Sequence, residues 1–303
     1  MEKPLSGIIP PLVTPLLDRD VLDVEGLERL IEHVISGGVH GIFILGTTGE
    51  APSLSHRLRR EIIERTCKQV AKRLPVLVGI TDSAFVESVE IAKFAADNGA
   101  DALVLAPPYY FPAGQPELME YLIHILKELP LPLFLYNMPS HTKLFYEPET
   151  VYQIAQMPGV VGLKDSSGNM VYFHQLKFLF KDHSNFSLLI GPEELLAETL
   201  LLGGHGGVCG GANFYPKLYV DLYDASQRGD LAEVMRLHEK IIQIRSTIYS
   251  VGKYGSSVIK GIKCSLSCMG ICNDFMAEPF HRFQAKERKI VQQHLRDLGL
   301  LKE

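Results

Sequence analysis

Short apolar runs alternate with longer amphipathic segments along most of this chain. The runs are rich in Val, Ile and Leu, and each stops at glycine, proline or polar residues, which is typical of strands buried on both faces. Eight of them are predicted strands, namely Ile8–Val13, Gly41–Leu45, Pro75–Gly79, Ala102–Ala106, Leu133–Tyr136, Gly159–Lys164, Phe186–Ile190 and Gly206–Cys209.

The segments between these runs have helical spacing and recognisable ends. Asp23 is a candidate N-cap, and the helix that follows it stops at Gly37-Gly38. Further helices are predicted from about Ser55, from Phe85 to Asn98, from Pro116 to Leu129 and from Pro148. Strands that alternate with helices imply parallel pairing through right-handed crossovers.

Eight such units predict an α/β fold, a closed (β/α)8 TIM barrel over residues 1–228. An open doubly wound sheet would carry a glycine fingerprint after its first strand, and Pro10–Thr14 is unlike one. Residues 229–303 contain helical patterns without strands, at Leu231–Tyr249, Ser256–Met269 and Lys286–Leu298. We expect them to form a C-terminal helical extension packed on the barrel.

Composition and charge narrow the possible partners. The net charge of -5 and the pI near 6.1 argue against a nucleic acid or an anionic membrane as partner. The start Met1–Pro4 leads into no signal-like apolar core, and no run is long enough to span a membrane. We therefore expect a cytoplasmic protein.

The five cysteines do not suggest a disulfide framework or a metal site. Cys264, Cys268 and Cys272 fall four residues apart and are predicted to share one helix face. Neither CxxC nor HExxH occurs, so core packing is the preferred interpretation and no metal is expected.

Lys164 is the main chemical candidate. It ends the sixth predicted strand, and alternation places Val160, Gly162 and Lys164 on one side, with Gly162 clearing space beneath the lysine. Burial disfavours the charged ammonium, and the neutral amine is a nucleophile that can attack a ketone. A lysine that only extends into solvent at a strand end is the alternative.

Other polar residues fall at the ends of neighbouring strands, where barrel enzymes carry their chemistry. Tyr136 ends the fifth strand and could transfer protons near Lys164, or simply plug the barrel mouth. Thr47 and Thr48 lie in a tight turn suited to a carboxylate, although an ordinary turn would use the same residues. Glu193 and Glu194 would accept hydrogen bonds from sugar hydroxyls, or mark a solvated helix start.

Five ordered motifs together resemble the dihydrodipicolinate synthase and N-acetylneuraminate lyase family of class I aldolases, over nearly the whole chain. The motifs are Gly46–Glu50, Pro108–Tyr110, Tyr136–Pro139, Gly162–Asp165 and Gly203–Val208 with Ala212-Asn213. The resemblance implies that Lys164 forms a Schiff base with pyruvate or a 2-keto acid and that Tyr136 relays protons. It also implies that Thr47 and Thr48 hold the carboxylate and join the relay, with Thr48 as a catalytic residue.

The resemblance also implies further roles. Tyr110 would reach the site of a neighbouring subunit, Gly191 and Val208 would line the pocket through their backbone, and the protein would be a homotetramer built from dimers. No cofactor is implied. The substrates would be small molecules, a 2-keto acid and an aldehyde.

Three departures from the family pattern bear on the substrate. Dihydrodipicolinate synthases carry an arginine where this chain has His141, and a neutral imidazole cannot replace that guanidinium. Lys143 nearby is an alternative source of positive charge. The lysine-feedback site of some synthases is only partly matched, by His56 and Glu87. Gly210 stands where sialic-acid lyases use a serine, which counts against sialic acid.

The preferred hypothesis is a metal-free class I aldolase that makes or breaks a carbon–carbon bond of pyruvate or of a 2-keto-3-deoxy sugar acid. Dihydrodipicolinate synthase itself, a keto-deoxy sugar acid dehydratase and a non-catalytic 2-keto acid sensor are the alternatives. The pairing of Tyr136 with Lys164 disfavours the sensor, since binding alone has no need of both residues.

Overall fold

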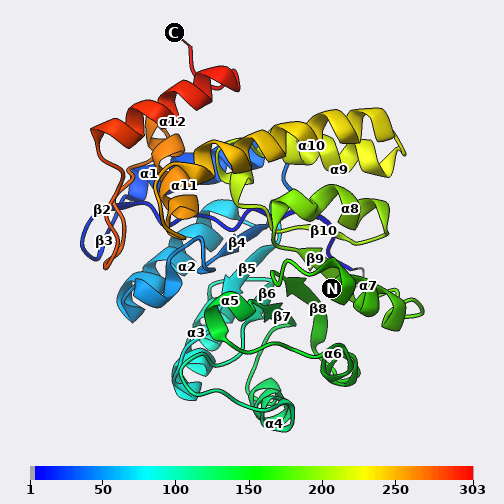
Figure 1. Cartoon of the computed structure of the whole chain (residues 1–303). Helices are drawn as coiled ribbons and strands as arrows, with labels where there is room; N and C mark the ends of the chain where they lie inside the picture. The colour runs from blue at the N-terminus through cyan, green and yellow to red at the C-terminus, as the bar shows by residue number, and fades with distance from the viewer. Residues whose placement is uncertain (1–3, 303) are drawn as a thin grey trace.

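A curled sheet of parallel strands forms the centre of the molecule (Figure 1). The computed structural model describes residues 4–302, and within them the sheet has eight strands. In their order across the sheet they are β1 (Gly7–Ile8), β10 (Gly206–Gly207), β9 (Ser187–Ile190), β8 (Val160–Asp165), β7 (Leu133–Asn137), β6 (Ala102–Leu105), β5 (Val76–Gly79) and β4 (Ile42–Ile44).

The two edges of the sheet meet through the segment that follows β1. Pro11 pairs with Phe43 of β4 in a parallel bridge, and the Leu12 N–H donates to the Phe43 carbonyl at 2.8 Å. The predicted strand Ile8–Val13 is broken here, because Pro10 and Pro11 lack the N–H groups that a continuous ladder needs. The prediction of a barrel is confirmed, with its first strand reduced to two short pieces.

A helix follows each strand and packs on the outside of the sheet, as predicted (Figure 1). The N-cap role of Asp23 is confirmed, since its carboxylate accepts the Gly26 N–H at 2.9 Å. The barrel helices are α1 (Val24–Ser36), α2 (His56–Val70), α3 (Phe85–Asp97), α4 (Gln115–Leu126), α6 (Pro148–Ala155), α7 (Met170–Leu179), α8 (Leu196–Leu201) and α9 (Pro216–Gln227).

Several short elements in the connections were not predicted. A hairpin of β2 (Leu16–Asp18) and β3 (Val21–Leu22) precedes α1, and the single turn α5 (Pro139–Thr142) follows β7. Four 3₁₀ turns complete the loops, η1 (Ala51–Ser53), η2 (Glu193–Leu195), η3 (Gly210–Asn213) and η4 (Ile248–Ser250). Most of them lie at the carboxyl ends of strands, where they shape the barrel mouth.

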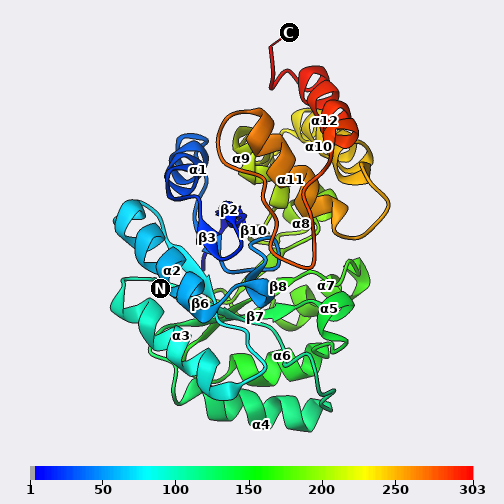
Figure 2. The ribbon, with the colours of Figure 1, turned by 90° about the vertical axis from the view of Figure 1, so that its left-hand side faces the viewer.

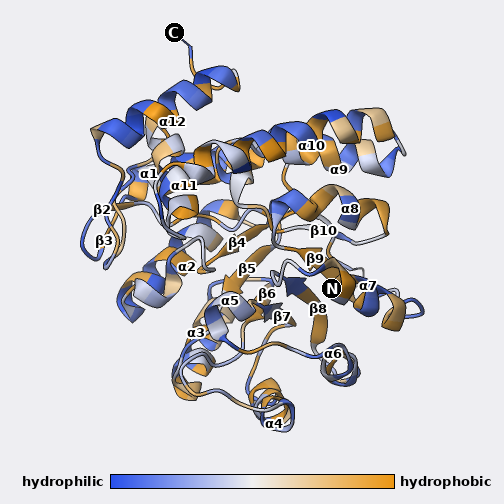
Figure 3. Cartoon of the chain, viewed as in Figure 1, coloured by the Kyte–Doolittle hydropathy of each residue, from blue (hydrophilic) through white to orange (hydrophobic). Residues whose placement is uncertain are grey.

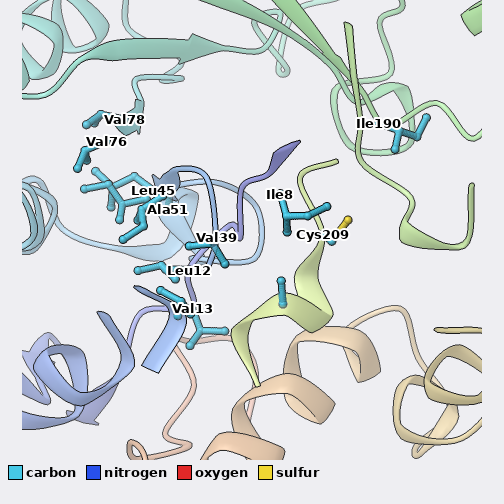
Figure 4. Close-up of a cluster of buried hydrophobic side chains, with 14 of the residues drawn as sticks. Ile8, Leu12, Val13, Val39, Leu45, Ala51, Val76, Val78, Ile190 and Cys209 are labelled. Atoms are coloured by element: carbon cyan, nitrogen blue, oxygen red, sulfur yellow. The ribbon is translucent and has the colours of Figure 1, made fainter. Parts of the chain in front are cut away.

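The barrel has an inner and an outer apolar core. The inner one contains Phe43, Val104, Phe134, Tyr136 and Val208 among others, and the outer one lies between strands and helices. Figure 4 shows part of the outer core, and Figure 3 shows the apolar strands surrounded by helices of mixed polarity. Residues that alternate along a strand enter the two cores in turn, which explains the continuous apolar runs.

The register between β7 and β8 shifts by one residue, and this corrects part of the expected alternation. Leu133 pairs with Val160, but Phe134 already pairs with Gly162. Val160 therefore belongs to the outer core, while Gly162 and Lys164 face inward as predicted. The ring of Phe134 fills the space above Gly162, where a Cβ would lie 2.5 Å from a ring carbon.

The C-terminal helices α10 (Leu231–Ser246), α11 (Ser257–Cys268) and α12 (Ala285–Asp297) lie together on one side of the barrel (Figures 1 and 2). The expected boundary at residues 228/229 falls in the turn between α9 and α10. Helix α11 ends at Cys268, so Cys272 lies beyond it. The prediction that Cys272 shares a helix face with Cys264 and Cys268 is therefore wrong. All five cysteines are free, and only Cys268 is not buried.

Among residues 4–302, no helix combines the length and the apolar character that crossing a membrane requires.

Candidate active site

Lys164 and Tyr136 face each other across two adjacent strands. They are direct register partners in β8 and β7, and each is 6% exposed. The Lys164 amine lies 4.0 Å from the centre of the Tyr136 ring and 5.1 Å from that of Phe43. Among the described residues, no carboxylate lies within 4.0 Å of this amine. The lysine is therefore buried against aromatic rings rather than held in an ion pair.

The phenol of Tyr136 is prepared for proton transfer. Burial alone would raise its pKa, but the positive charge of Lys164 and hydrogen bonds with Thr47, Ser166 and Lys164 outweigh burial. The net result is a pKa below the ordinary tyrosine value. A phenol that ionises more readily is present more often as phenolate, the form that accepts a proton.

Thr47 connects the tight turn after β4 to this pair. Its Oγ1 lies 3.2 Å from the Tyr136 hydroxyl oxygen. Thr48 is half-buried beside it in the same turn. The structure thus brings Thr47 to Tyr136, while Thr48 stands one residue further along the turn, and the expected roles of both threonines stay predictions.

A cavity of about 230 Å³ opens beside Tyr136 and Phe43. Its wall is largely apolar, and its polar groups come from the strand-end loops. Those groups belong to Thr47, Thr81, Tyr109, Tyr136, His141 and Thr142. The rings of Tyr136 and Phe43, whose centres lie 4.0 and 5.1 Å from the lysine amine, border the cavity, whereas Lys164 itself is not among the residues that line it.

Gly191 and Val208 lie at the ends of β9 and β10, on the other side of Lys164. Their N–H groups donate to the carbonyls of Asp165 and Ile190, at 2.7 and 2.8 Å. A Cβ at position 191 would lie 1.9 Å from the Ser166 hydroxyl oxygen, so a larger residue there would displace that side chain. Val208 packs in the inner core with Tyr136. Their expected part in lining the pocket stays a prediction.

Comparison with known proteins gives the family. The model of the dihydrodipicolinate synthetase family matches residues 4–298. The chain belongs to the dihydrodipicolinate synthase family. A 4-hydroxy-tetrahydrodipicolinate synthase of Ralstonia nicotianae is 32% identical over 98% of this chain and 99% of its own length. A probable 2-dehydro-3-deoxy-D-pentonate aldolase of Escherichia coli is 34% identical over 89% of both chains.

Solved structures of dihydrodipicolinate synthase family members agree with the fold. A structure described as dihydrodipicolinate synthase from Bacteroides thetaiotaomicron has a TM-score of 0.96 and 60% identity, over 98% of this chain and 100% of that one. A family member from Escherichia coli, solved in complex with pyruvate, has a TM-score of 0.92 and 29% identity, over 98% and 99%. The prediction of a class I aldolase or lyase is confirmed at the level of the family.

Two acidic residues that the sequence suggested for the site, Glu193 and Glu194, are bound to other residues of the chain. Glu193 is 4% exposed, and its two oxygens accept the Gly211 N–H at 2.8 Å and the Tyr219 hydroxyl at 2.6 Å. Burial raises its pKa despite these bonds. Glu194 lies 3.2 Å from Arg245. Neither carboxylate borders the cavity, so contact with substrate hydroxyls stays a prediction without support from this geometry.

His141 borders the cavity from α5, where dihydrodipicolinate synthases carry an arginine. Its Nδ1 lies 2.9 Å from the Ser140 hydroxyl oxygen. Burial and the charge of Lys143 both lower the pKa of His141, which favours the neutral imidazole. The Lys143 amine donates to the Ser140 carbonyl at 2.7 Å and does not border the cavity.

Tyr110 lies away from Lys164 within this one chain. It is 77% exposed on the loop after β6 and stacks edge-to-face with Phe111, which is 78% exposed. Its neighbour Tyr109 borders the cavity instead. A role for Tyr110 at the site of another subunit stays a prediction.

Two residues of the site were not predicted from the sequence. Phe43 supplies the second ring beside the lysine, and Ser166 contributes a hydrogen bond to the phenol. Strand alternation could have found Ser166, since it is two residues after Lys164. Nothing local to Phe43 distinguishes it from the other apolar residues of its strand.

Proposed function

We propose that Lys164 forms a Schiff base with pyruvate, or with a 2-keto-3-deoxy sugar acid, as the first step of carbon–carbon bond cleavage or formation. The observation that carries this proposal is the buried lysine amine, 4.0 Å from the Tyr136 ring at the edge of the cavity. The pyruvate bound to the related Escherichia coli protein supports the keto acid.

The covalent steps are assigned to Lys164 and Tyr136. The neutral Lys164 amine attacks the ketone carbon, the ketone oxygen gains a proton, and loss of water leaves an iminium ion. In cleavage, the Tyr136 phenolate takes the proton of the C4 hydroxyl, and the C3–C4 electron pair moves into an enamine as the aldehyde leaves. Protonation at C3 and hydrolysis then release pyruvate.

We assign the turn residues Thr47 and Thr48 to the substrate carboxylate. Hydroxyl groups and backbone N–H groups of a tight turn donate hydrogen bonds to such an anion. The contact between Thr47 and Tyr136 supports this assignment, because it keeps the carboxylate end of the substrate next to the proton relay.

The cavity wall favours an uncharged acceptor aldehyde. None of the lining residues is a lysine or an arginine, and the lowered pKa of His141 favours an imidazole without charge. Aspartate semialdehyde brings its own carboxylate, which this wall does not match. The hydroxyaldehyde released from a keto-deoxy sugar acid is neutral, and the imidazole of His141 can hydrogen-bond its hydroxyl groups. The 34% identity to a probable pentonate aldolase is consistent with this substrate class.

Dihydrodipicolinate synthase activity is the second candidate. It is favoured by the 60% identity to a structure described by that name. Condensation with aspartate semialdehyde would use the same iminium and enamine, so the choice between the two depends on the acceptor.

Trapping tests the Schiff base. Pyruvate followed by borohydride should attach a reduced adduct to Lys164, found by peptide mapping, and Lys164→Met should give none. An adduct elsewhere, or none on the unmodified chain, would refute the assignment. For the acceptor, kcat/KM should be higher with glyceraldehyde than with aspartate semialdehyde, and His141→Arg should shift this ratio toward the semialdehyde. The opposite ratio would favour the synthase.

We also propose a homotetramer built from dimers, working in the cytoplasm. The exposed Tyr110 and Phe111 suit one subunit contact, and Val171, Phe178 and Leu202, each at least half exposed, suit a second. Free cysteines are usual for a reducing compartment.

A further inference from the structure

A buried ion pair connects the C-terminal extension to the turn that carries Thr47 and Thr48. The Lys263 amine of α11 donates to Glu50 Oε2 at 2.5 Å, and the two side chains are 0% and 4% exposed. Glu50 Oε1 accepts the Ala277 N–H at 2.9 Å. Both oxygens of the carboxylate are therefore held by residues outside the barrel.

Glu50 closes the turn in a conformation that needs outside support. Its φ is 56°, and Leu45 at the start of the turn has a φ of 58°. Such values are unfavourable for non-glycine residues, and they persist where the surroundings hold them. The Glu50 N–H donates to the Thr47 carbonyl at 3.0 Å. A change at Glu50 is thus transmitted directly to the backbone of Thr47.

The contacts continue from the turn to the proton relay. Thr47 Oγ1 lies 3.2 Å from the Tyr136 hydroxyl oxygen, which completes a path Lys263–Glu50–Thr47–Tyr136. The Gly49 carbonyl is fixed from the other side by the Thr14 hydroxyl, at 2.7 Å. Glu50 is the point of the turn that α11 holds.

A buried ion pair adds little net stability compared with apolar residues of similar size, because both charges lose their hydration. Removing one partner has a large effect, since the other charge is then buried alone. A pair of this kind at the end of a binding turn is better explained by the geometry that it specifies than by stability.

We propose that Lys263 is a positioning residue for the keto-acid subsite. By pairing with Glu50 it keeps the Thr47–Thr48 turn in the shape that binds the substrate carboxylate and keeps Thr47 at the Tyr136 phenol. The inference rests on the proposed function, in which this turn holds the carboxylate.

The test compares Lys263→Met with Lys260→Met, a matched change on the same helix at a lysine with no carboxylate within 4.0 Å among the described residues. Active sites are counted by borohydride trapping of pyruvate at Lys164. Rates are expressed per trapped site. We expect KM for pyruvate to rise about tenfold or more in Lys263→Met and to stay unchanged in Lys260→Met. A structural role alone would lower the number of sites and leave KM unchanged, and that result would overturn the proposal.

Glu50→Gln decides the matter if Lys263→Met does not fold. It removes the charge but keeps an acceptor for the Ala277 N–H, and its KM for pyruvate should also rise. An unchanged KM in a folded Glu50→Gln would overturn the proposal. Failure of the proposed function is separate, because then the unmodified chain itself would give no adduct at Lys164.

Discussion

At the scale of single residues, the site depends on opposing effects on one phenol. Burial raises the pKa of Tyr136, and the charge of the adjacent Lys164 with three hydrogen bonds lowers it further than burial raises it. The lysine thus acts in two states, as the nucleophile when its amine is neutral and as the charge that favours phenolate when it is protonated. Once the amine is converted to an iminium ion, a positive charge is still present beside the phenol.

Lys164→Met should reverse the lowering of the Tyr136 pKa. Without the positive charge only burial and the remaining bonds act, so the pKa of the phenol should rise above its value in the unmodified chain. Ultraviolet difference titration would measure this ionisation, with Tyr136→Phe identifying the signal among the other tyrosines. An unchanged titration would mean that the amine does not act on the phenol.

Glu193 provides a second prediction at this scale. Glutamine at position 193 cannot accept from both Gly211 and Tyr219, so Glu193→Gln should lower the free energy of unfolding by about 1–3 kcal/mol. Urea denaturation measures this. Glu194→Gln is the matched control, and loss of its surface pair with Arg245 should cost at most about 1 kcal/mol. A higher KM for a sugar acid with unchanged stability would instead place Glu193 at the substrate.

The residues of the site divide into those that sequence could and could not predict. The nearness of Lys164 and Tyr136 was predictable, because both end neighbouring strands and alternation gives their side. Lys263 was not, since its partner Glu50 lies 213 residues away and neither local pattern refers to the other. Predictions from alternation hold only while the register is regular.

At the scale of elements, one register shift sets the geometry of β7 and β8. Because Phe134 pairs with Gly162 rather than with the preceding residue, Lys164 lies directly opposite Tyr136. The strands and helices themselves were predictable from local apolar patterns. The shift, the hairpin before α1 and the short 3₁₀ turns were not, because they depend on pairing and on brief loop conformations.

Gly162→Ala should disturb this pairing. Its Cβ would lie 2.5 Å from the Phe134 ring and 2.7 Å from the Ser187 carbonyl oxygen. We expect the free energy of unfolding to fall by about 1–3 kcal/mol, measured by urea denaturation. Gly255→Ala is the control, since a Cβ there meets nothing within 4 Å. Equal stability of the two variants would contradict the close packing inferred at Gly162.

At the scale of the whole molecule, exposed aromatic side chains suggest that one chain is not the complete enzyme. Tyr110→Ala should reduce the assembled mass measured by sedimentation, and kcat with it, because the proposed contact places Tyr110 at a neighbouring site. Tyr254→Ala is a matched control, since Tyr254 is 78% exposed but lies on the C-terminal extension. An unchanged mass for Tyr110→Ala would rule out this contact.

The reach of Lys263 and Ala277 back to Glu50 has a consequence for synthesis on the ribosome. The turn is made early, whereas the two groups that hold its carboxylate lie 213 and 227 residues further along the chain. A nascent chain can thus pair its strands before it can set this turn. Competence to bind a keto acid should therefore arise only after Lys263 and Ala277 have emerged from the ribosome.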